Sequence, residues 1–200
     1  KRENCTNKGE IKVTGTIGNE SNTGSDCFIG GFCYRSSEGT ETWKNCHNEG
    51  AITLTSTASV ANSIRVAGFI PNCEYANTVM TFEGNCSNSG NITIDGAKSS
   101  VHSNGVVNVG GLIAIDSAGT SLTITDTLTN SGIITIKNTS FSSDVHIGGC
   151  FGQTIHALKD VSNTAAINIS NVKFNDTTYI SGCIGEINAK VGLENIHNTG

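Results

Sequence analysis

Histidines and cysteines are the side chains in this sequence that could bind a metal ion or act as catalytic groups. Metal sites use Cys and His residues at short spacings, yet the sequence has no C-x-x-C pair, and the adjacent Cys46 and His47 recur nowhere. The five histidines are scattered, at His47, His102, His146, His156 and His197. We therefore expect neither a metal site nor a cofactor.

The acidic residues could serve an enzyme that cleaves polysaccharides, because glycoside hydrolysis needs two carboxylates about 5–9.5 Å apart. Asp126, Asp160 and Glu194 are the best-placed acids, since they precede a recurring asparagine in successive repeats. Asp116 and Glu186 follow another recurring segment but lie two repeats apart. No nucleophile stands beside a base, so we predict that the chain is not an enzyme, and we expect Asp126, Asp160 and Glu194 to be solvated edge charges.

The elements that carry these residues are repeats. Each begins with an asparagine, has a small residue two positions later, and continues into an alternating apolar segment such as Ile92-Thr93-Ile94. The recurring asparagines are Asn7, Asn48, Asn88, Asn130, Asn163 and Asn198. Repetition at a nearly fixed period is typical of solenoids, in which each repeat forms one coil of a stack.

A second recurring segment lies between these asparagines and carries a glycine in every copy. The glycines are Gly31, Gly68, Gly111, Gly149 and Gly182. Alternation of apolar and polar residues predicts a strand in each segment, and a third strand is expected just before each asparagine. The sequence thus predicts an all-β parallel β-solenoid (β-helix) of about five coils, with two to three strands per coil and variable projecting loops. We expect one such domain over residues 1–200.

The asparagine column predicts an internal ladder. Asparagine at a corner can hydrogen-bond to its own backbone and tolerates positive φ. Identical amides stacked at the strand spacing of ~4.8 Å can also bond to one another along the stack. We therefore expect Asn7, Asn48, Asn88, Asn130, Asn163 and Asn198 to form a structural ladder.

Two interpretations of the cysteines remain open, namely buried free thiols and disulfides between neighbouring coils. Cys150 and Cys183 share one column of the repeat, and a second column contains Cys5, Cys46 and Cys86. In-register stacking places their Cα atoms ~4.8 Å apart, within the disulfide range of roughly 4.4–6.8 Å. Parallel neighbours, however, often direct their Cβ atoms poorly for a disulfide. Cys73 follows Pro71 outside these columns, and we expect it to be exposed.

An outward column of the second segment is the predicted contact surface for a ligand. It contains Phe28, Arg65, Asn108, His146 and Tyr179, which alternate with inward apolar residues. An exposed aromatic such as Tyr179 could stack on a sugar or on a partner protein. Glycosylation sequons at Asn19, Asn138 and Asn175 are expected in variable loops, where a eukaryotic secretory host would modify them.

Composition narrows the choice of partners. The net charge is −5, whereas proteins that bind nucleic acids carry basic stripes. No apolar stretch approaches the ~20 residues that a transmembrane helix needs. Open solenoid ends expose unpaired strand edges, so we expect a segment of a longer protein, flanked by neighbouring repeats or stacked end to end on copies of itself.

Two segments resemble the GLUG-type repeats of large bacterial and protist surface proteins. Val109-Gly110-Gly111-Leu112-Ile113 and Ile147-Gly148-Gly149-Cys150-Phe151-Gly152 carry the resemblance, together with the segments that begin at Asn130 and Asn163. The resemblance implies an extracellular, adhesin-like or stalk role at the cell surface. It assigns no catalytic residues.

We predict a non-catalytic, extracellular surface repeat protein that serves as a structural stalk, filament or adhesin and contacts a glycan or a host surface protein. One alternative is a polysaccharide-active β-helix enzyme. Another is an ice- or crystal-surface binder, which would need a flat array of outward threonines. Thr53, Thr93 and Thr135 share an outward column, but Lys12 and Asn168 occupy its other positions.

Overall fold

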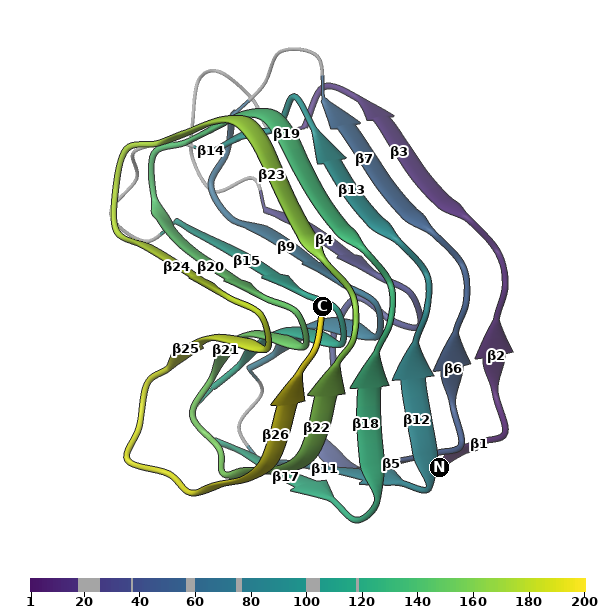
Figure 1. Ribbon diagram of the computed structural model, residues 1–200. Helices are drawn as coiled ribbons and strands as arrows, with labels where there is room; N and C mark the ends of the chain where they lie inside the picture. The colour runs from purple at the N-terminus through teal and green to yellow at the C-terminus, as the bar shows by residue number, and fades with distance from the viewer. Residues whose placement is uncertain (18–25, 37, 57–59, 75–76, 100–104, 118) are drawn as a thin grey trace.

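The computed structural model describes residues 1–200 apart from 18–25, 37, 57–59, 75–76, 100–104 and 118. Strands of successive coils lie beside one another in parallel and form a β-solenoid of about five coils (Figure 1). The predicted all-β solenoid fold is therefore confirmed. In the described ranges there is no helix long and apolar enough to span a membrane.

Parallel sheets run along the stack, and five of them are formed by the described residues. Sheet I contains β1 (Arg2–Glu3), β5 (Gly39–Lys44), β11 (Thr78–Glu83) and β17 (Thr120–Ile124). Sheet II contains β2 (Thr6–Asn7), β6 (His47–Asn48), β12 (Asn85–Asn88), β18 (Thr127–Asn130), β22 (Leu158–Asn163) and β26 (Leu193–Asn198). Sheet III contains β3 (Ile11–Gly15), β7 (Ile52–Ser56), β13 (Ile92–Asp95), β19 (Ile134–Phe141) and β23 (Ile167–Phe174). In the same sheet, β14 (Lys98–Ser99) pairs with the second half of β19, and β8 (Val60–Ala61) pairs with β14.

The last two sheets carry the glycine-containing segment. Sheet IV contains β4 (Cys27–Gly30), β9 (Ile64–Ala67), β15 (Val106–Gly110), β20 (Asp144–Gly148) and β24 (Thr178–Ser181). Sheet V contains β10 (Ile70–Cys73), β16 (Ile113–Asp116), β21 (Phe151–Thr154) and β25 (Ile184–Ile187). A coil thus contributes up to six short strands, as β5 to β10 do, rather than the two to three that the sequence predicted. The residues that follow the glycines form strands of their own.

The cross-section has two lobes (Figure 1), and an apolar core fills each of them. Residues such as Ile92 and Val107 fill the core between sheets III and IV. Residues such as Trp43, Leu128 and Phe151 fill the core among sheets I, II and V. The cross-section narrows between these cores to what we call the waist. At the waist the recurring glycines, such as Gly68 and Gly111, lead from sheet IV into sheet V.

The asparagine ladder runs through this waist, and the structure confirms it. Each Nδ2 donates a hydrogen bond to Oδ1 of the next asparagine along the stack. The bonds join Asn7 to Asn48, Asn48 to Asn88, Asn88 to Asn130, Asn130 to Asn163 and Asn163 to Asn198, at 2.7, 2.7, 2.8, 2.8 and 2.9 Å. The same Nδ2 of Asn88 also donates to the Gly90 carbonyl at 3.0 Å. Each amide therefore stabilises both its own corner and the contact between coils.

Glycines of the second segment pack directly against this ladder. A Cβ placed on Gly111 would overlap the Asn130 side chain and the Gly149 carbonyl oxygen, and Gly68 meets Asn88 in the same way. The waist is thus only one amide side chain and one glycine thick. This thickness explains why glycine recurs at this position in every coil.

Candidate functional site

The predicted contact column of sheet IV is in register but is largely hidden from solvent. Phe28, Arg65, Asn108, His146 and Tyr179 pair successively across the sheet. Arg65, Asn108 and His146 are only 8%, 0% and 4% exposed, and Tyr179 is 40% exposed. The expectation of a solvent-facing column was therefore wrong for its three central residues.

The column is buried because sheet V folds back against sheet IV. A Cβ on Gly152 of sheet V would lie 3.0 Å from both N and O of Val109 in sheet IV. Gly185 has the same relation to Ile147. Only small side chains fit between the two backbones, so the polar residues beside them are enclosed. We call this polar interface between sheets IV and V the seam.

Hydrogen bonds across the seam satisfy most of its polar groups. Arg65 Nη1 donates to Asn72 Oδ1 at 3.0 Å and forms an ion pair with Glu74. The remaining contacts are Asn108 Nδ2 to Gln153 Oε1 at 3.3 Å, Gln153 Nε2 to Glu186 Oε2 at 2.7 Å, and His146 Nε2 to Glu186 Oε2 at 3.1 Å. Sequence reasoning missed Asn72 and Gln153, although polar residues seven positions after Arg65 and His146 were a usable signal.

His146 is a neutral donor within the seam. Burial lowers its pKa, and the nearby Glu186 carboxylate opposes that shift. The Asn108 amide lies 3.3 Å from Nδ1 and can donate to it, which leaves the proton on Nε2 facing Glu186. The ring also stacks on Tyr179, with centroids 5.3 Å apart and an interplanar angle of 6°. Through these contacts His146 helps to hold sheets IV and V together.

A second polar cluster, which we call the buried cluster, lies at the end of sheet V, where Asp116 and Thr154 meet Thr120 of sheet I and the partly exposed His156. Asp116 is 2% exposed and accepts hydrogen bonds from Thr120 Oγ1 at 2.7 Å and Thr154 Oγ1 at 2.8 Å. Nδ1 of His156 lies 2.6 Å from Asp116 Oδ2, and Nε2 lies 2.8 Å from the Thr120 carbonyl oxygen. Both ring nitrogens therefore act as donors, and neither is free to take a proton from a nucleophile.

The acids singled out in the sequence do not form a catalytic pair. Asp126 accepts a hydrogen bond from the Gly84 amide at 2.8 Å, and Glu194 pairs with Lys159 at 3.0 Å. Glu186 belongs to the seam and Asp116 to the buried cluster. Glu194 lines one surface pocket together with Lys159, and Asp160 lines another.

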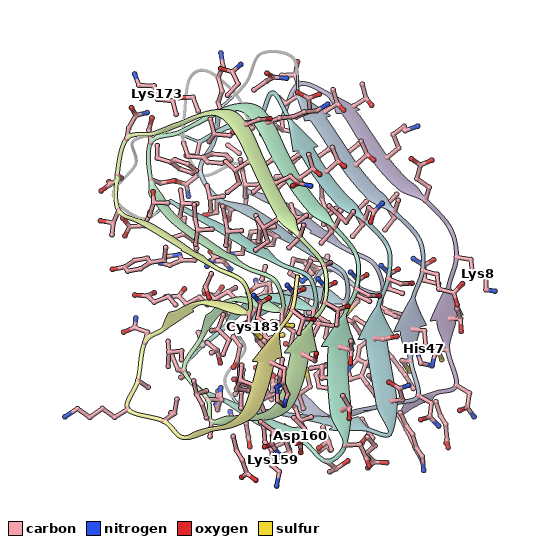
Figure 2. The ribbon with its side chains drawn as sticks, in the orientation of Figure 1. Lys8, His47, Lys159, Asp160, Lys173 and Cys183 are labelled. Carbon is pink, nitrogen blue, oxygen red and sulfur yellow. The ribbon has the colours of Figure 1, made fainter. Side chains whose placement is uncertain are left out.

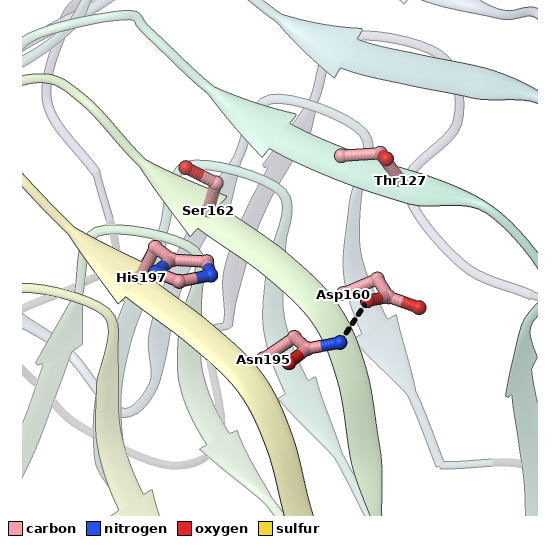
Figure 3. Close-up of a pocket in the computed structure, with 5 residues that line it drawn as sticks. All are labelled: Thr127, Asp160, Ser162, Asn195 and His197. Atoms are coloured by element: carbon pink, nitrogen blue, oxygen red, sulfur yellow. Dashed lines mark hydrogen bonds between the residues drawn. The ribbon is translucent and has the colours of Figure 1, made fainter.

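This pocket lies on the outer face of sheet II and encloses about 240 Å³ (Figure 3). Thr127, Asp160, Ser162, Asn195 and His197 line it, from β18, β22 and β26. Asn195 Nδ2 donates to Asp160 Oδ1 at 2.8 Å. All five lining residues have polar side chains, and one of these is a carboxylate. No cluster of three or more metal-ligating side chains occurs in the part of the chain that the structure describes.

All eight cysteines are free thiols. Cys150 and Cys183 share a column as predicted, and Cys46 and Cys86 are similarly close, with the Cys46 amide 3.4 Å from Cys86 Sγ. Figure 2 shows Cys183 in the middle of the cross-section. Burial raises the pKa of Cys150 well above its usual value, and a hydrogen bond from Cys150 lowers the pKa of Cys183. Cys5 is half-buried at one end of the second column.

The expectation that Cys73 is exposed was wrong. The residue is 2% exposed, and it pairs with Asp116 across sheet V. Its side chain packs in the core that contains Trp43 and Phe69. Burial raises its pKa well above the usual value for a thiol.

The three glycosylation candidates have different surroundings. Asn138 lies within β19 rather than in a loop, at φ 53°, and bonds to Asp95 and Asn171 at 2.9 and 2.8 Å. Asn175 is exposed between β23 and β24, and its Nδ2 donates to the Phe141 carbonyl at 3.2 Å. Asn19 lies outside the described residues.

Comparison with known proteins yields no relative for this chain. No family model matches it, and no curated protein and no solved structure is significantly similar.

Proposed function

We propose that this chain is a non-catalytic repeat of an extracellular surface protein, in which a rigid solenoid displays an adhesive outer face. The observation that carries the proposal is that the side chains best suited to chemistry are used as internal contacts. His146 bonds across the seam, and His156 and Asp116 bond within the buried cluster. The resemblance to GLUG-type repeats supports the same role.

The regular stacking supports a display function. Five sheets, the asparagine ladder and the glycine contacts fix each coil relative to the next. Side chains that point outward are consequently held at the strand spacing of ~4.8 Å along each column. A solenoid built in this way offers a long contact surface for other molecules.

The two alternatives have weaker support. A glycosidase would need a second carboxylate beside Asp160, and the other four lining residues of its pocket are uncharged or histidine. Thr53, Thr93 and Thr135 do pair in successive coils, but Lys12 and Asn168 extend the same column. Three threonines make a short array for an ice surface, and threonine is common on strands in any case.

The proposal can be tested by passing the purified chain over immobilised glycans, polysaccharides and extracellular matrix proteins. We expect retention on at least one surface, with no release of fragments from it as judged by mass spectrometry. Release of fragments that increases with time and with protein concentration would instead establish an enzyme. Failure to bind any of the surfaces would overturn the adhesive role.

A further inference from the structure

The polar pocket on sheet II is a feature that neither the seam nor the buried cluster uses (Figure 3). We propose that it binds a single hydroxyl-rich sugar residue of a glycan, with Asp160 accepting hydrogen bonds from neighbouring hydroxyl groups. This inference rests on the proposed adhesive function, and it names the ligand class and the residues involved.

Two of the lining residues are held in place by the backbone. Asp160 and Asn195 occupy equivalent corner positions in adjacent coils and have positive φ values of 54° and 52°. Their side chains are joined by a 2.8 Å hydrogen bond to Asp160 Oδ1. Oδ2 accepts no hydrogen bond from another described residue. The carboxylate is therefore oriented before a ligand arrives, and one of its oxygens remains available.

The neighbouring outward column is also open at the pocket, whereas a hydrogen bond joins its side chains at His47 and Ser87. His47 and Ser87 are adjacent in this column, and His47 Nδ1 lies 2.9 Å from Ser87 Oγ. Ser162 and His197 are an adjacent pair of the same two residue types in the opposite order at the pocket, and their side chains make no hydrogen bond to any described residue. The same two residue types thus bond to each other in one coil pair and leave their polar atoms free in the other.

The free groups match the chemistry of a sugar. A hydroxyl group both donates and accepts, and the pocket offers a carboxylate acceptor, the hydroxyls of Thr127 and Ser162, and the His197 ring. Asp160 is its only acidic side chain, so an anionic ligand would be repelled. The cavity is smaller than the range of about 300–1,000 Å³ that is usual for drug-sized ligands. One sugar ring therefore fits better than a longer segment.

The test uses the ¹⁵N-labelled chain and four free sugars, D-glucose, D-galactose, D-mannose and N-acetyl-D-glucosamine. We expect at least one sugar to cause saturable shifts in the backbone amide signals of residues 160–162 and 195–197. Asp160→Asn should weaken this binding about tenfold or more, which corresponds to about 1.4 kcal/mol. Asparagine tolerates positive φ, so this variant is expected to keep the corner.

His197→Ala tests the opposite side of the pocket, and His47→Ala is its matched control because both residues belong to the same outward column of sheet II. Only His197→Ala should weaken the binding. The inference is overturned if no sugar shifts these signals, or if Asp160→Asn binds as tightly as the unaltered chain. If the chain is still retained on immobilised surfaces in that case, the adhesive function stands and its contact site lies elsewhere.

Discussion

Asp116 accepts a 2.6 Å hydrogen bond from Nδ1 of His156, a residue 40 positions further along the chain. The carboxylate of the pair is buried whereas the imidazole is 19% exposed, and two threonine hydroxyls complete the contacts of the carboxylate. Such a pair is costly to break because removing one partner leaves the other without compensation in a poorly solvated site.

Replacing Asp116 by alanine should therefore lower the free energy of unfolding by about 3–5 kcal/mol. Chemical denaturation of the variant and the unaltered chain measures this difference. Glu194→Gln is the control, since Glu194 pairs with Lys159 at the surface, where water screens the interaction. Equal stability of the Asp116 variant and the control would show that the buried pair contributes little.

The same pair predicts a pH dependence. The hydrogen bond to Asp116 raises the pKa of His156 above its ordinary value near 6.5. The contribution of the charged ring to stability is complete below that ordinary value and is lost as the pH rises through the raised pKa. The melting temperature of the unaltered chain, relative to that of His156→Gln, should therefore fall with rising pH. The two melting temperatures should be compared from about pH 5 to about pH 9, because this range spans the ordinary pKa of histidine. A melting-temperature difference that stays constant over that range would contradict the prediction.

The ladder predicts that an asparagine inside the stack contributes more to the free energy of unfolding than one at its end. Asn88→Ala should cost about 1–3 kcal/mol of unfolding free energy, because two buried neighbours each lose a hydrogen-bond partner. Asn130→Ala should behave in the same way. Asn7→Ala should cost less, since Asn7 bonds to one neighbour of the ladder and is half-buried. Unchanged melting temperatures for Asn88→Ala and Asn130→Ala would refute a stabilising ladder.

The waist predicts strong intolerance to a methyl group. Gly111→Ala should destabilise the chain by at least about 1–3 kcal/mol, because the new Cβ would overlap the Asn130 side chain and a carbonyl oxygen of the next coil. Gly192→Ala provides the comparison, as a Cβ there meets nothing within 4 Å. Thermal denaturation of the two variants tests the contrast, and similar melting temperatures would mean that the waist can widen.

Burial predicts the order in which the thiols react. Cys73 and Cys150, whose pKa values are raised by burial, should be alkylated slowly by iodoacetamide in the native chain. Cys183, with its lowered pKa, should react before Cys150. Mass spectrometry of the labelled peptides gives the rates, and a sample unfolded in denaturant serves as the reference. Rapid native labelling of Cys73 would show that its side of the core opens readily.

Repetition made the stacking predictable from the sequence. Identical residues in successive coils, such as Asn88 and Asn130, identified the ladder without any knowledge of the corner geometry. The glycine column that contains Gly111 was likewise identified by its recurrence, and the structure gives the reason in its close contacts. Such columns can be aligned directly in the sequence, because each residue packs against the residue at the same position of the next coil.

The seam was harder to predict because alternation separates the two faces of a strand without saying what covers each face. His146 was correctly placed opposite the apolar residues, but it contacts sheet V rather than solvent. The small residues at Gly152 and Gly185 were the available sign of that approach. Cys73 was misplaced for a related reason, since its column partner is the acid Asp116 rather than another apolar residue.

The pocket depends on side chains from three coils and so could be only partly anticipated. Asp160 was recognised as a well-placed acid, whereas His197 was noted as one of five scattered histidines. Their proximity to each other, and to Asn195, follows from the strand register of β22 and β26. The sequence of one repeat alone therefore could not predict that these side chains meet.

The hydrogen bonds of the ladder all point the same way, from Nδ2 of one asparagine to Oδ1 of the next. The amide dipoles therefore add along the stack, as peptide dipoles do along a helix. This gives the solenoid a chemical direction that its apolar cores lack. A coil that continued the ladder past Asn198 would have to present an amide oxygen, and one that preceded Asn7 would have to present an NH₂ group, so two such solenoids could extend each other's ladder only head to tail.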